Sequence, residues 1–278
     1  MFDKIRHLVF WPSFLILMGA VVMSFIDLEG FLRVTKGLNA TLLERFSWFF
    51  SLGSFYLLIL ILVVYFSPLG KVRIGGEEAK PLLSKTRWFS ITLCTTLAVG
   101  VLFWTTAEPI YHLNFPPSSW GLEPGSVEAA KFSMSAMIFH WSFTPYAIYA
   151  VPSLVFALAF YNMRLPFSIG SSLQPVFGNH VLGKNGQVID TVALYALVAG
   201  MASSLGTGAM TLVGGVGEFM DITTTPVTLA VAISLIVTTF VVSAATGLHK
   251  GIARLSAVNM YFLLFLGLFV FVFGPTIY

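Results

Sequence analysis

The chain has 278 residues, of which 57% are hydrophobic and only 10% charged, and its net charge at pH 7 is +3. Soluble domains carry about 25% charged residues, so the composition indicates an integral membrane protein and excludes a soluble globular one. The small net charge gives no sign of nucleic-acid binding. The single cysteine, Cys94, excludes an intrachain disulfide.

Seven apolar segments are long enough to cross a bilayer as helices, which takes about 20 residues. In chain order they are residues 8–26, 45–66, 88–107, 132–160, 190–213, 227–246 and 256–276. The fourth is longer than a span requires, so we expect it to be tilted, kinked or extended into the interface. The connections are too short for a separate soluble domain. The sequence therefore predicts an all-α membrane protein with seven transmembrane helices.

The loop charges alternate along the chain, and cytoplasmic loops of membrane proteins are rich in Lys and Arg. If the N-terminus is cytoplasmic, eleven of the 15 Lys and Arg residues fall on the cytoplasmic side and four on the other. Five of the eleven lie in or beside the loop 67–87, which could also contact anionic lipid. We therefore predict a cytoplasmic N-terminus and an outer C-terminus.

The fourth segment gathers aromatic rings around a proline, with Trp141, Tyr146 and Tyr149 on either side of Pro145. A quaternary ammonium cannot donate a hydrogen bond and is bound by the faces of such rings. On an ideal helix the three rings would spread over roughly 140°, and Pro145 should bend that turn. Packing and interface aromatics are the alternative interpretation, and the residues taken alone favour it.

Four stretches carry a resemblance to a known family. They are 70-GKVRIGGEEAKP-81, 98-AVGVLFWTTAEPIYH-112, 139-FHWSFTPYAIYAVPSLVFALAFYNMRLPFSI-169 and 200-GMASSLGTGA-209. In this order they resemble the betaine–choline–carnitine transporter family, and the similarity covers nearly the whole chain.

The resemblance implies an architecture of twelve helices, in which two leading helices precede two inverted five-helix repeats of the leucine-transporter type. Residues 1–87 would hold the two leading helices and a cytoplasmic loop, and residues 88–278 the first repeat. The chain then resembles the front half of a transporter. The sequence does not distinguish a split gene from a pseudogene or a fragment.

The function that the resemblance implies is secondary transport of small quaternary-ammonium osmolytes, such as glycine betaine, choline or carnitine, across a bacterial inner membrane. A sulfonium or an amino acid is an alternative substrate. The alternative to transport is a half-module or inactive remnant that needs a second-repeat partner. The expected partners are lipid, the substrate, a second-repeat chain and, by resemblance, two further copies in a trimer.

The resemblance also implies a substrate site. Its aromatic box would draw on Trp141, Tyr146 and Tyr149, and Tyr146 stands where many members have Trp. Several glycines of the third helix let an unwound backbone approach the substrate in the family. This chain retains only Gly100, with Ala98 beside it, so small-residue helix packing is an equal alternative.

Sodium-coupled members of the family use two hydroxyl side chains one helical turn apart on the fifth helix. The aligned positions here, Leu197 and Met201, cannot ligate sodium, whereas Ser203 and Thr207 are one turn apart and would serve in a shifted alignment. Coupling to sodium, to protons or to neither stays open, and no cofactor is expected.

An enzyme or a haem subunit finds little support in the sequence. His112 and His140 are the only plausible metal or haem pair, and no ligand spacing joins them. No nucleotide-binding loop or nucleophile–base pair is present. Glu108, followed by a proline at the end of the third segment, is interpreted as structural.

Overall fold

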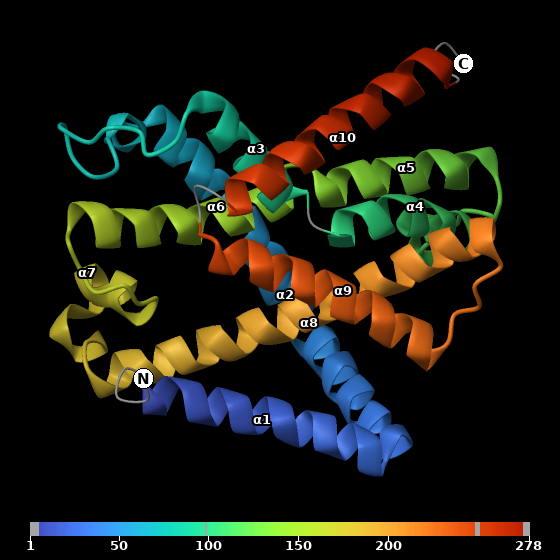
Figure 1. Ribbon diagram of the computed structural model, residues 1–278, viewed down its shortest axis with the longest axis horizontal. Coiled ribbons are helices and arrows are strands. Elements are labelled where there is room, and N and C mark those ends of the chain that lie inside the picture. The colour runs from blue at the N-terminus through green and yellow to red at the C-terminus, as the bar shows by residue number, and fades with distance from the viewer. Residues whose placement is uncertain (1–5, 98, 248–250, 275–278) are drawn as a thin grey trace. The chain divides into compact units, whose positions relative to one another are not determined.

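The computed structural model describes residues 6–97, 99–247 and 251–274, and Figure 1 shows its helices. All regular secondary structure in these ranges is helical. The α-helices are α1 (His7–Ile26), α2 (Leu28–Phe66), α3 (Lys85–Thr96), α4 (Val99–Asn114), α5 (Val127–Trp141), α6 (Phe143–Ala157), α7 (Gln174–Phe177), α8 (Lys184–Met220), α9 (Pro226–Ala245) and α10 (Ala253–Phe273). Short 3₁₀ turns cover Pro68–Lys71, Ser118–Trp120, Gly170–Leu173 and Gly178–Val181, and a π-helical turn covers Leu158–Asn162.

Six spans of the described chain are long and apolar enough to cross a membrane, or seven if the bent pair α3–α4 is one span. The predicted class is thus confirmed, six to seven candidate spans fit the predicted seven, and the chain is a multi-pass all-α membrane protein. Large apolar side chains, such as Phe262, Phe265 and Phe269 of α10, are exposed in the isolated chain. Such exposure suits lipid and would be a liability in water.

Two helices are longer than the apolar segments that predicted them. Helix α2 begins at Leu28, where the Asp27 carboxylate accepts a hydrogen bond from the Gly30 N–H at 2.9 Å and caps the first turn. Helix α8 likewise extends beyond both ends of the predicted 190–213 segment. Hydropathy marks the part of a helix that lies in hydrocarbon, whereas caps and backbone hydrogen bonds set where the helix ends.

One non-helical residue interrupts the fourth span close to where its proline predicts a bend. Helix α5 ends at Trp141, α6 begins at Phe143, and Ser142 between them has non-helical angles (φ −93°, ψ −110°). The ring of a helical proline clashes with the carbonyl four residues earlier, which here is that of Trp141. Pro145 itself lies in the first turn of α6, where a missing N–H costs nothing.

The third span is also interrupted. Helix α3 ends at Thr96 and α4 starts at Val99, and the chain bends by 44° between the two helices. Ala98, one of the predicted site residues, lies between them and outside the described residues.

The helices pack as two compact units. One comprises the chain up to Ala79 together with Ile138–Met201, and the other comprises Lys80–Met137 together with the chain from Ala202 onward. In the first unit α2 packs along both α1 and α6. In the second, α3 packs along α10, where the Ser90 hydroxyl donates to Met260 Sδ at 3.1 Å. The predicted boundary at residue 87 separates the leading helices from the first repeat. The packing units do not test it, so it stays a prediction.

Hydrogen bonds within the first unit tie together segments that the charge pattern places on one side of the membrane. The Asn162 side chain accepts from the Gly75 N–H at 2.9 Å and donates to the Arg73 carbonyl at 3.0 Å. Farther along, Asp190 of α8 pairs with Arg6, which precedes α1. These contacts agree with the predicted alternation of loops, and which side is cytoplasmic stays a prediction.

Candidate functional site

The three predicted box residues belong to the same compact unit. Trp141 is the last residue of α5 and is half-buried, whereas Tyr146 and Tyr149 on α6 are 38% and 55% exposed. The two tyrosines are three residues apart and therefore lie on one face of α6. Ala147, about 100–160° around the helix from them, is buried. The tyrosine faces are thus turned away from the packed side of α6.

The break at Ser142 corrects one detail of the predicted box. The expected arc of 140° assumed one ideal helix from Trp141 to Tyr149, and the non-helical Ser142 interrupts it. The fixed spacing therefore holds only for Tyr146 and Tyr149. Neither tyrosine hydroxyl has a hydrogen-bond partner among the described residues.

The other predicted site residues belong to the second unit. Gly100 lies in the first turn of α4, just after the interruption of the third span, and a Cβ added there would meet no atom within 4 Å. The space beside its backbone is therefore open. The approach of a substrate to this backbone stays a prediction.

Ser203 and Thr207 lie one turn apart on α8, as the sequence predicts. The Thr207 hydroxyl donates to the Ser203 carbonyl at 2.9 Å and to the Ser204 carbonyl at 3.2 Å. The Thr207 hydroxyl proton is therefore used in hydrogen bonds to the α8 backbone, and the hydroxyl oxygen keeps lone pairs that can face a cation. Hard cations take several oxygen ligands, so these two hydroxyls would supply only part of an ion site.

A buried carboxylate was missed at the sequence level. Asp190 near the start of α8 is only 7% exposed and accepts hydrogen bonds from the Ser168 hydroxyl and the Gly170 N–H, besides its ion pair with Arg6. Its position at the edge of the fifth apolar segment was the available signal, since acids within spans are rare and mark specific roles.

Glu108 lies differently from its prediction. Helix α4 continues through Pro109 to Asn114, so Glu108 lies within the helix, not at its end. Its carboxylate is 3.6 Å from His112 Nε2 one turn later. The His112 ring meets Phe132 of α5 edge-on, and Phe132 also contacts Trp120 of the connecting loop. This cluster ties the loop to both helices, which supports a structural role.

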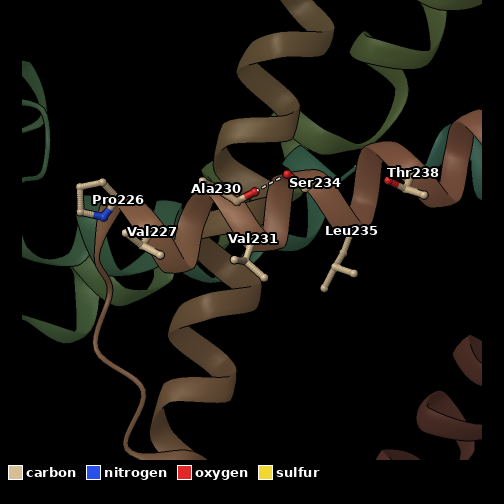
Figure 2. Close-up of a pocket in the computed structure, with 7 residues that line it drawn as sticks. All are labelled: Pro226, Val227, Ala230, Val231, Ser234, Leu235 and Thr238. Atoms are coloured by element: carbon tan, nitrogen blue, oxygen red, sulfur yellow. Dashed lines mark hydrogen bonds between the residues drawn. The ribbon is translucent and has the colours of Figure 1, made fainter.

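A groove on α9 involves none of the predicted site residues. It is lined by Pro226, Val227, Ala230, Val231, Ser234, Leu235 and Thr238 (Figure 2). The Ser234 hydroxyl donates to the Ala230 carbonyl at 2.7 Å, so even this polar group is satisfied within the helix. A groove that is apolar and lined by one helix suits lipid or another helix better than a small cation.

Comparison with known families covers almost the whole sequence. The family described as "BCCT, betaine/carnitine/choline family transporter" matches residues 8–278. The chain belongs to this family. The broken third and fourth spans are thus features of a BCCT-family chain, and the family is one of transporters, not of enzymes.

Curated relatives share about a third of the residues. The "Probable glycine betaine transporter" of Desulfitobacterium hafniense (strain Y51) is 31% identical over 99% of this chain and 55% of its own length. The "Glycine betaine transporter OpuD" of Bacillus subtilis (strain 168) is 32% identical over 98% of this chain and 53% of its own. The "High-affinity choline transport protein" of Escherichia coli (strain K12) is 29% identical, with 99% and 40% covered. The chain spans about half the length of these relatives.

Proposed function

We propose that this chain forms part of a secondary transporter for small quaternary-ammonium osmolytes, of which glycine betaine, choline and carnitine are the candidates. The observation that carries the proposal is the family match over residues 8–278. The names of the relatives favour glycine betaine and choline. In this proposal the chain lies in a bacterial inner membrane with its N-terminus in the cytoplasm.

The exposed aromatic faces supply the chemistry. A desolvated cation over a Trp or Tyr ring gains about 0.5–2 kcal/mol, and Trp141, Tyr146 and Tyr149 would form one wall of the substrate site. Tyr146 and Tyr149 leave α6 on the side away from its packing, so a second wall must come from elsewhere. Gly100 and Ala98 would bring bare backbone to the site, and Ser203 with Thr207 would contribute to an ion site.

The incomplete wall also supports the alternative function, a half-module that acts only with a second-repeat chain. A chain that spans half the length of its relatives would contribute one repeat, and an inverted-repeat carrier binds its substrate between two. In this alternative the substrate chemistry is the same and the transport unit contains the partner chain. Assembly as a trimer remains part of the proposal by resemblance alone.

The test is uptake by vesicles that contain this chain together with a second chain carrying the remaining helices. We expect accumulation of labelled glycine betaine or choline above that of vesicles with either chain alone. Labelled proline and a sulfonium analogue serve as competing substrates that distinguish a quaternary-ammonium site from a broader one. The proposal would be contradicted if the assembled pair showed no uptake and no binding of any quaternary ammonium.

A further inference from the structure

Asp190 is the centre of a set of contacts that the transport proposal does not use. Its carboxylate accepts the Ser168 hydroxyl at 2.9 and 2.7 Å and the Gly170 N–H at 2.9 Å, and its Oδ2 lies 2.5 Å from a guanidinium nitrogen of Arg6. All four residues belong to the same compact unit. A buried carboxylate is costly unless it is paired and hydrogen-bonded, and here both oxygens are hydrogen-bonded and one is also paired with Arg6.

The partners of Asp190 lie on a connection that is itself tightly held. The Ser171 hydroxyl donates to the carbonyls of Pro166 and Ser168 at 2.6 and 2.7 Å. A Cβ on Gly170 would lie 2.6 Å from the Gly186 carbonyl oxygen, so this turn packs directly against the backbone of the first turn of α8. The segment 166–173 thus packs against α8 and is hydrogen-bonded to Asp190 of that helix.

Helix α1 lies against the same part of α8 (Figure 1). The Ser13 hydroxyl donates to the Thr191 carbonyl at 3.0 Å, and the Thr191 hydroxyl donates to the Leu8 carbonyl at 2.8 Å. Arg6 precedes this helix by one residue. The chain before α1 therefore reaches Asp190 independently of the 166–173 connection.

The contacts of Asp190 differ in how easily they open. Ser168 and Gly170 reach the carboxylate from the packed connection, whereas the Arg6 side chain is 45% exposed and lies outside any helix. Water can replace an exposed guanidinium at little cost, while hydrogen bonds to a buried carboxylate are costly to lose. We propose that Asp190, Ser168 and Gly170 form the fixed part of a latch at this end of the unit, and that Arg6 is its releasable arm. When Arg6 leaves, the buried Asp190 carboxylate loses its counter-charge. The hydrogen bonds from Ser168 and Gly170 then hold the connection alone, and it opens to water more often.

The test measures how fast a buried position of the connection reacts. Ser172 is 8% exposed, and among the described residues its hydroxyl donates to the nearby Ile169 carbonyl alone, at 2.6 Å. A Ser172→Cys reporter in the full chain with Cys94→Ser, purified in detergent, should react slowly with a water-soluble maleimide. We expect Arg6→Gln to speed the reaction by about fivefold to tenfold, and Arg6→Lys, which keeps the charge, to stay within about twofold of the parent.

The matched control is Asp27→Asn, because Asp27 is a carboxylate of the same unit that caps α2 and is exposed. It should leave the labelling rate within about twofold of the parent. Asp190→Asn should speed labelling at least as much as Arg6→Gln, and adding Arg6→Gln to it should give no further increase. Equal labelling of Arg6→Gln and the parent would overturn the latch, as would additive effects of the two changes. If Asp190→Asn does not fold, the Arg6 variants alone decide.

Discussion

At the scale of single residues, the proposed substrate recognition depends on the aromatic faces of α5 and α6. Trp141 ends one helix, and Tyr146 and Tyr149 share one face of the next. Indole has the strongest cation–π face of the three ring types. Trp141 should therefore contribute most, even though the break separates it from the regular spacing of the tyrosines.

We predict that Trp141→Leu weakens quaternary-ammonium binding about thirtyfold when the chain is paired with the proposed second-repeat chain. Loss of one desolvated ring contact of about 2 kcal/mol corresponds to that factor. Equilibrium binding of labelled glycine betaine is the measurement, with Phe50→Leu as the control, because Phe50 is an exposed aromatic residue of α2. If Trp141→Leu binds within about twofold of the parent while folded, the rings are only packing.

At the scale of elements, prediction from the sequence succeeded where one local cause acts. Apolar length identified every span, and Pro145 indicated the break that ends α5 at Trp141. The start of α2 was predicted too late because the Asp27 cap acts outside the apolar window. The contacts of Asp190 could not be predicted, because Ser168 and Arg6 come close to it only through tertiary packing.

The close packing of the 166–173 connection on α8 gives a prediction for this element. A Gly170→Ala side chain would meet the Gly186 backbone at 2.6–3.0 Å, and forced overpacking costs about 1–3 kcal/mol. We expect a lower midpoint of thermal unfolding in detergent. The control is Gly37→Ala in α2, where a Cβ meets nothing within 4 Å and Ala is the better helix former by about 1 kcal/mol. Equal midpoints for the two variants would show that the connection yields without cost.

At the scale of the whole molecule, the charge pattern predicts one topology, and contacts within the first unit agree with it. The hydrogen bonds of Asn162 to the 73–75 loop, and of Asp190 to the segment before α1, join loops that the sequence assigns to the same side. A reporter fused after Lys85 should therefore lie on the cytoplasmic side, and one fused after Gly125 on the outer side. Alkaline phosphatase and green fluorescent protein fusions measure this. Reporters on the same side would rule out the predicted alternation of spans.

The final prediction concerns what the chain does by itself. Its tyrosine wall is open on the side away from α2, and it spans about half the length of its curated relatives. Alternating access in inverted-repeat carriers comes from the motion of one repeat against the other around a shared site. If the chain contributes one repeat, as proposed above, it has no second repeat to move against. We expect vesicles containing only this chain to take up no more labelled betaine, choline or carnitine than empty vesicles do. Vesicles with a full-length relative serve as the positive control. Uptake by the chain alone well above that of empty vesicles would mean that it forms a complete site with copies of itself.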